Sequence, residues 1–245
     1  MATRAIKEAA AHFMQQFFQQ LVANGNQAIA HFITRPDNKK MAIVPGRLVD
    51  QVEEALNKWR EKAANGTRSP LPIFLMGFAK DYSSTGLEKG RSVALPKYTV
   101  CDDQGNFFYL RLDKHDQRVQ IVLFAPDHET AFSLASQFKL YCGDYGNRHL
   151  FSINHYNDLN YGFPMQLEDS QIFGASQQIA DQDNLTVLVF DLTFNCNTPY
   201  FLGDKVNRTP YLPTVQAVVL QEQQIKTRQM FFHNLEGTSI SELLD

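Results

Sequence analysis

The chain has 245 residues, of which 44% are hydrophobic, 12% aromatic and 20% charged, and its formal net charge is −3. Hydrophobic content this high excludes a wholly disordered chain, and the length suffices for one large domain with a substantial core. Without a basic excess the chain lacks the usual footprint of nucleic-acid binding, and no apolar run approaches the roughly 20 residues that cross a membrane, so we expect neither as a partner.

Residues 3–23 are predicted to form an amphipathic helix, because apolar residues recur in them at spacings of three and four. The apolar stripe consists of Ile6, Ala10, Phe13, Met14, Phe17, Phe18, Leu21 and Val22. A stripe with three phenylalanines must be covered, either by the chain's own domain or by a neighbouring subunit. A second helix is predicted at residues 48–64. Between the two helices we expect a turn at residues 35–40 and a short strand or extended link at Met41–Val44.

From residue 69 onward the apolar period changes to two, which indicates strands. The predicted strands are residues 72–80, 92–101, 106–112 and 118–125. Residues 102–106 supply turn chemistry for a hairpin between the middle two strands. Asp113, His115 and Asp116 are interpreted as a polar turn between the last two. The polar loop at residues 81–90 contains two glycines and is expected to be mobile.

A third helix is predicted to start at Pro126 and Asp127, where Asp127 is a good N-cap and Glu129 lies at the positive end of the helix dipole. Its buried face is expected to consist of Ala131, Leu134, Ala135, Phe138 and Tyr141 or Cys142. Gly143 ends this helix, and a strand returns at His149–Tyr156.

The remainder of the chain is again rich in strand patterns. Residues 186–195 and 214–221 are predicted strands, and three prolines between them predict a long projecting loop at residues 198–213. We therefore expect an α+β fold with an N-terminal helical elaboration. We expect residues 1–66 to form a helical region packed on the core, residues 67–233 the α+β core domain, and residues 234–245 a C-terminal tail.

Candidate groups for catalysis or metal binding are few. Phosphate-binding loops, nucleophile elbows and paired zinc ligands have no match, so we expect no enzyme, cofactor or metal site. His149 and His155 lie six residues apart on a predicted strand, about 20 Å, which is too far for one ion. Cys142 with His149 is a possible nucleophile–base pair, although a buried thiol at a helix end is the preferred interpretation.

The order of the elements resembles the tail-terminator and neck proteins of tailed bacteriophages. The segment Val119-Gln-Ile-Val-Leu-Phe-Ala-Pro-Asp-His-Glu-Thr-Ala-Phe-Ser-Leu-Ala is similar to their strand-then-helix passage. Thr186-Val-Leu-Val-Phe-Asp-Leu-Thr-Phe is similar to their long late strand. The resemblance covers about residues 70–200, and the N-terminal 65 residues and the loop 198–213 exceed the minimal design of that family.

This resemblance implies a curved, mainly antiparallel sheet flanked by helices, and a non-enzymatic virion protein made in the host cytoplasm. Copies of the chain would form a hexameric ring at the tail or neck, in contact with tail tube, sheath or neck proteins. The candidate subunit contacts are Phe13, Phe17, Phe18, Tyr82, Leu87, Tyr200, Phe201, Tyr211, Leu243 and Leu244.

Three alternatives remain at this point. The chain could be another tail or baseplate subunit. It could be a monomeric adaptor that binds one partner through the phenylalanine-rich helix. It could also be an enzyme whose site contains Cys142, Asp144, His149 and His155.

Overall fold

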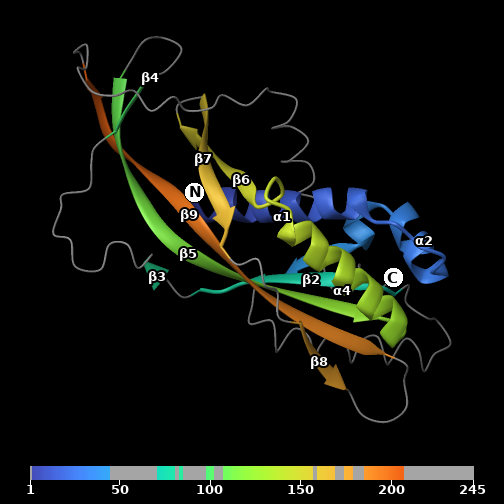
Figure 1. The fold of residues 1–245 in the computed structure, drawn as a ribbon. Coiled ribbons are helices and arrows are strands. Elements are labelled where there is room, and N and C mark those ends of the chain that lie inside the picture. The colour runs from blue at the N-terminus through green and yellow to red at the C-terminus, as the bar shows by residue number, and fades with distance from the viewer. Residues whose placement is uncertain are drawn as a thin grey trace.

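The computed structural model describes residues 2–44, 71–80, 83–84, 98–101, 107–156, 159–168, 174–178 and 185–206 (Figure 1). In chain order its elements are α1 (Ala2–Gln20), α2 (Gln27–Thr34), the 3-10 turn η1 (Asp37–Lys39), β1 (Met41–Val44), β2 (Ile73–Phe78), β3 (Ser83–Ser84), β4 (Tyr98–Cys101), β5 (Phe107–Ala125), α4 (His128–Gly143), β6 (His149–Tyr156), β7 (Leu159–Leu167), β8 (Gly174–Gln178) and β9 (Thr186–Val206). The strands form a curled, mainly antiparallel sheet in the order β1-β2-β5-β9-β7-β6. The predicted α+β class and the N-terminal helix are confirmed.

The antiparallel pair β5 and β9 is the axis of the sheet. It is paired from Phe107 with Val206 to Ala125 with Thr186, with one irregularity between Phe108 and Leu110. At about 3.3 Å per residue the ribbon is roughly 60 Å long. The second edge of β5 pairs in turn with β2, β3 and β4, and the second edge of β9 pairs with β7 and β8. β1 runs parallel to β2 at one end of the sheet, and β6 completes a hairpin with β7 at the other.

Two predictions about this ribbon were wrong. Asp113, His115 and Asp116 lie inside the continuous strand β5, where a turn between two strands was expected. The first nine residues of the expected loop 198–213 are the end of β9. Polar and proline residues are tolerated in both places because the neighbouring strands supply hydrogen-bond partners, which the one-dimensional pattern does not reveal.

The predicted helix at residues 48–64, the predicted strand at residues 214–221 and the tail 234–245 lie outside the described residues. Within the described part, the sequence pattern missed α2. Its start is set by Asn26, whose side-chain oxygen accepts a hydrogen bond from the Ile29 backbone N–H at 3.1 Å. Met41–Val44 forms β1, as expected for a short strand.

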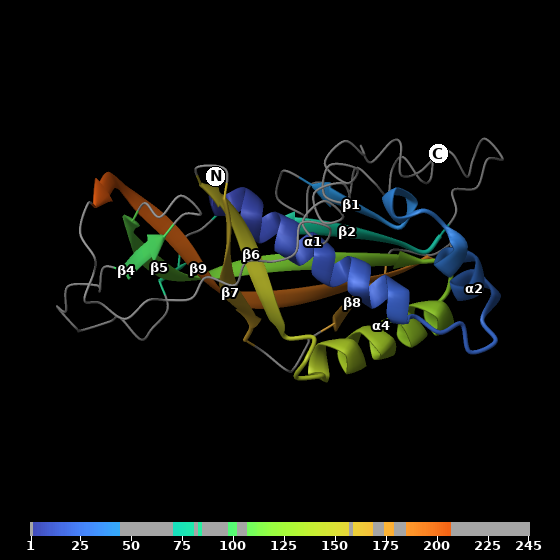
Figure 2. The same ribbon diagram turned by 90° about the horizontal axis from the view of Figure 1, so that it is seen from above.

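Helices α1 and α4 cover one face of the sheet, with α1 lying along the strands β6 and β9 (Figure 2). The phenylalanines of α1 fill the space between them. Phe13, Phe17 and Phe18 are at most 2% exposed. They join a cluster of rings that also contains Phe32, Phe74, Phe138, Tyr141, Phe190 and Phe194.

The three α1 phenylalanines are therefore not subunit contacts, and that prediction was wrong for them. Covering their rings with the chain's own sheet removes them from water as fully as a neighbouring subunit would. The stripe on α1 identified a buried face correctly, but it did not distinguish which surface covers it.

The ribbon changes its buried side along its length. In the half next to the helices, odd-numbered β5 residues such as Val119 and Ile121 belong to the helix-side core, while Val122 and Phe124 pack in a second cluster on the opposite face. In the other half, a third cluster contains even-numbered β5 residues. Its members are Val100, Phe108, Leu110, Tyr161 and Phe163, with Leu112 and Phe201 packed against them.

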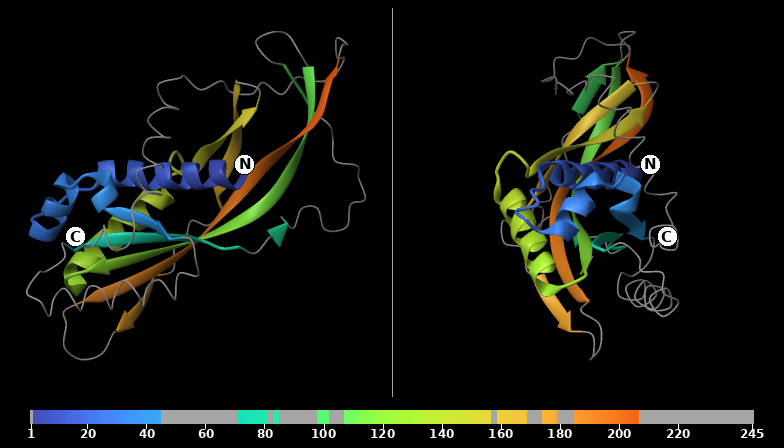
Figure 3. Two further views of the ribbon diagram at one scale, coloured as in Figure 1. Left: turned by 180° about the vertical axis from the view of Figure 1, so that it is seen from behind. Right: turned by 90° about the vertical axis from the view of Figure 1, so that its right-hand side faces the viewer.

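We call this second half of the ribbon, residues 107–112 and 199–206 together with β4, the arm. Figure 3 shows that the arm extends past both helices. Between the arm and the rest of the ribbon, polar side chains bond to neighbouring strands. Asn195 Nδ2 donates to Asp116 Oδ1 at 3.3 Å, and Asn197 Nδ2 donates to the Pro164 carbonyl at 2.7 Å. The continuous twist of the strands turns the ribbon relative to its surroundings at this polar stretch, so a different face becomes buried.

Helix α4 is fixed in place by polar contacts at its start and middle. Asp127 caps it as predicted, because its Oδ1 accepts from the Thr130 backbone N–H at 2.7 Å. The Thr130 hydroxyl donates to Asp127 Oδ2 and accepts from Asn26 Nδ2 at 3.0 Å, which ties α4 to the start of α2. Gln137 bonds to both the backbone N–H and the carbonyl of Val22. These contacts orient α4 with one face toward the sheet and the other toward solvent.

Candidate functional site

The proposed pair of Cys142 and His149 is not assembled as a nucleophile and base. Cys142 is fully buried at the end of α4, and burial raises the pKa of its thiol strongly, with a weaker opposing effect of Arg148. His149 is exposed on β6, and its Nδ1 lies 2.9 Å from the Tyr145 carbonyl oxygen. Asp144 Oδ1 accepts from the Gly146 backbone N–H at 2.8 Å. The structure therefore supports the preferred interpretation of Cys142 as a buried thiol at a helix end.

Cys196 lies in a comparable environment on β9. Burial, followed by the negative charge of Asp116, raises its pKa to about 12, while a backbone hydrogen bond from Gln117 acts in the opposite direction. Both thiols therefore stay protonated in the folded chain well above their ordinary pKa of 9.0. Neither has the exposed thiolate of a reactive cysteine.

Because the pKa values of these two thiols are raised in the folded chain, we expect the folded state to lose stability at alkaline pH. Between about pH 9 and pH 12 only the unfolded chain releases the Cys196 proton, so the free energy of unfolding falls as the pH rises. The slope is at most about 1.4 kcal/mol for each pH unit and each thiol. Urea unfolding at pH 8 and pH 10.5 measures it. A chain carrying Cys142→Ala and Cys196→Ala should show a smaller alkaline loss than the parent, and an equal loss would contradict the assignment.

The other polar side chains considered as candidate site residues lie within strands. Asp113 Oδ2 and His115 Nδ1 are 3.6 Å apart within β5, two residues apart on one side of the strand. His149 and His155 lie at opposite ends of β6. In the part of the chain that the structure describes, no three His, Cys, Asp or Glu side chains gather as metal ligands. Among the helices it describes, none has the length and hydropathy to cross a membrane.

Two of the predicted subunit contacts lie on the arm. Tyr200 is on β9 opposite Arg111 of β5, and its exposed fraction is 57%. Phe201 points to the other side, where its ring centroid is 5.6 Å from that of Tyr161 in the third cluster. Tyr200 is thus available to a partner, and Phe201 mainly holds the arm together. Tyr82, Leu87, Tyr211, Leu243 and Leu244 lie outside the described residues.

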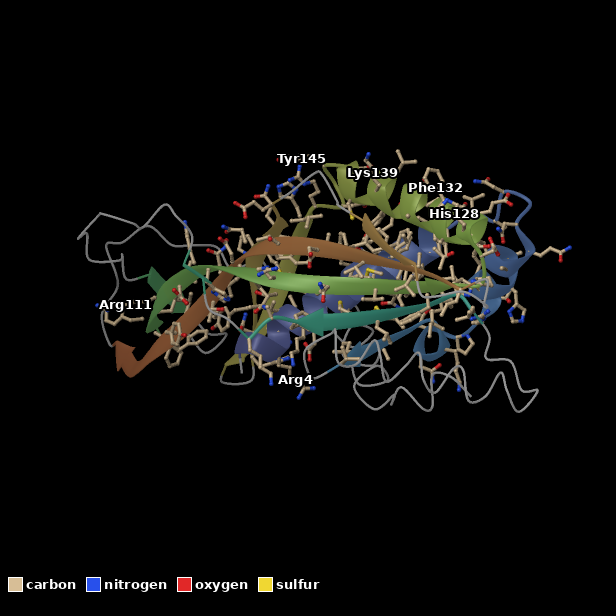
Figure 4. The ribbon with its side chains drawn as sticks, turned by 90° about the horizontal axis from the view of Figure 1, so that it is seen from below. Arg4, Arg111, His128, Phe132, Lys139 and Tyr145 are labelled. Atoms are coloured by element: carbon tan, nitrogen blue, oxygen red, sulfur yellow. The ribbon has the colours of Figure 1, made fainter. Side chains whose placement is uncertain are left out.

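The outer face of α4 was not recognised from the sequence. We define the α4 face by the residues on the side of the helix that points away from the sheet, namely His128, Glu129, Phe132, Ser136, Lys139 and Leu140. Phe132 and Leu140 are 64% and 75% exposed, and Tyr145 just after the helix is 74% exposed. Figure 4 shows His128, Phe132, Lys139 and Tyr145 along the outer side of the molecule.

A signal for this face exists in the sequence. Phe132 and Leu140 lie eight residues apart, which places them within one broad side of a helix, opposite to Leu134 and Phe138. Apolar residues on both sides of a helix indicate that both sides become covered. The predicted buried face of this helix contained only the residues on the sheet side.

No protein-family model matches the chain, and no curated protein shows significant similarity to it.

Proposed function

We propose that this chain is a structural subunit of a tailed-phage virion that forms a ring at the tail end or neck. The observation that carries the proposal is the curled, mainly antiparallel sheet with α1 and α4 on one face, the architecture that the resemblance requires. Another position in the tail or baseplate would use the same architecture. In this role the chain acts by shape and contact, and closed rotational symmetry completes the ring without free ends.

The arm supports this proposal because it offers a contact element away from the helices. Its third cluster buries one side of the ribbon, while the other side presents Arg111 and Tyr200 to solvent. Tyrosine and arginine are enriched in protein interfaces, where each combines a large contact area with hydrogen-bonding groups. A projecting three-stranded element, packed through the third cluster against β7, reaches a neighbour without unfolding any part of the helix-side core.

The test is the native mass of the purified chain by light scattering, combined with negative-stain imaging of the same sample. We expect ring-shaped particles in which each ring contains about six copies. Tyr200→Ser should weaken the ring, whereas Tyr145→Ser removes an even more exposed tyrosine from outside the arm and should leave the ring in place. A monomer at every concentration would contradict the proposed ring and favour a binding module that acts as a single copy.

A further inference from the structure

The α4 face and two residues beside it, Val22 and Tyr145, expose large apolar side chains. Phe132, Leu140 and Tyr145 are each more than 60% exposed, and Val22, bonded to Gln137 of α4, is 56% exposed. Aromatic side chains each cover about 150–250 Å², so these four residues expose on the order of 500 Å². The largest apolar patch of a typical soluble monomer is about 300–600 Å², and such patches are often functional.

The residues of the α4 face are arranged almost symmetrically about Ser136. Phe132 lies four residues before Ser136 and Leu140 lies four residues after it. When two copies of α4 run antiparallel and cross at Ser136, Phe132 of each copy meets the partner's Leu140. The small side chain of Ser136 lets the helices approach closely at the crossing point.

The charges of the α4 face fit the same antiparallel arrangement. Glu129 and Lys139 are exposed, seven residues before and three residues after Ser136. At 1.5 Å per residue, Glu129 of one copy and the partner's Lys139 are offset by about 6 Å along the helices, within reach of two long side chains. A parallel arrangement would place like charges side by side. In the antiparallel arrangement the two helix dipoles also point in opposite directions, which is electrostatically favourable.

We propose that the α4 face binds the same face of a second copy of this chain, in an antiparallel pair with a two-fold axis at Ser136. Complete burial of this surface on both copies removes at most about 1,000 Å² of apolar surface from water, which is near the lower limit for a specific interface. It is isologous, because each copy contributes the same surface.

This inference goes beyond the proposed ring, whose neighbours meet through unlike surfaces. Pairing of α4 faces joins two rings, or two single copies, through residues of α4 and not through the arm. A variant that blocks the pair would halve the mass of a double ring and leave ring-shaped images. Pairs without rings would instead contradict the proposed function and leave this inference intact.

A charge exchange between two variants tests the pair directly. Glu129→Lys gives a face with two positive positions, and Lys139→Glu gives a face with two negative positions. Sedimentation velocity should show that each variant alone pairs about tenfold more weakly than the parent, and that an equimolar mixture recovers the parent affinity. In an antiparallel pair the mixture makes the same two opposite-charge contacts as the parent, whereas in a parallel pair, where the parent opposes like charges, the mixture would pair more tightly than the parent. If the mixture behaves like its weaker components, the proposed pair is wrong.

Cysteine cross-linking locates the two-fold axis. Ser136→Cys should form a disulfide between copies under mild oxidation, because the axis brings the two thiols together. Glu129→Cys is the matched control, since it lies about 10 Å from the axis and about 20 Å from its symmetry mate. Phe132→Ser and Leu140→Ser should each weaken pairing about tenfold with unchanged thermal unfolding. Pairing that survives both substitutions, or a parent chain that never pairs, would overturn the inference.

Discussion

Phe17→Ala is expected to lower the free energy of unfolding by about 3–5 kcal/mol, the range for removing a fully buried phenylalanine ring. Phe17 is 1% exposed. Its ring centroid lies 4.9 Å from that of Phe138 on α4 and 6.1 Å from that of Phe74 on β2. The Phe17 ring thus connects α1 both to helix α4 and to the sheet. Its removal leaves a cavity between α1, α4 and β2. These elements cannot move to fill the cavity without losing other packing contacts.

Urea unfolding followed by circular dichroism measures this change, at a protein concentration low enough to keep the chain monomeric. Phe132→Ala is the matched control, because it removes the same side chain from a position that is 64% exposed. Its effect should stay within about 0.5 kcal/mol. Equal effects of the two substitutions would contradict the placement of α1 against the sheet.

Asp116→Pro is expected to cost about 3 kcal/mol or more, because it places a proline within a strand that is paired on both sides. Asp116 is opposite Asn195 of β9 and Ser83 of β3. The proline removes a backbone N–H from this ladder and forces the local backbone away from extended geometry. If residues 113–116 formed a turn, as their polar composition suggested, a proline there would be tolerated.

Asp116→Ala separates the side chain from the backbone in this experiment. It removes the hydrogen bond from Asn195 and should cost about 1 kcal/mol. Chemical unfolding of both variants, with thermal unfolding as a second measurement, compares them. Proline and alanine variants of equal stability would show that residues 113–116 are not a central strand.

Much of the fold could be predicted because local patterns determine local structure. The capping residue Asp127 and the apolar spacing after it set α4, and the capping residue Asn26 sets α2 in the same way. The apolar alternation of residues 186–195 predicted the first half of β9. These features depend on contacts a few residues apart, which the order of residues specifies directly.

The candidate site was predicted less well, because whether a side chain is exposed depends on which other elements cover that side of its helix or strand. The sequence identified the sheet side of α4 through Leu134 and Phe138, and it contained Phe132 and Leu140 on the other side. Only the position of α4 at the outside of the fold shows that these two remain exposed. Likewise, only the packing of α1 against the sheet shows that Phe13, Phe17 and Phe18 lie in the core and are not subunit contacts.

By itself, the sequence determined the α+β class, the positions of α1 and α4, and the strands with clear alternation. The tertiary structure alone decided that β5 passes without a break through Asp113, His115 and Asp116, and that β9 continues to Val206. A polar residue forms a turn or stays in a strand according to whether hydrogen-bond partners lie beside it. In this protein those partners come from β9, β3 and β7, which are distant in the sequence and adjacent only in the folded sheet.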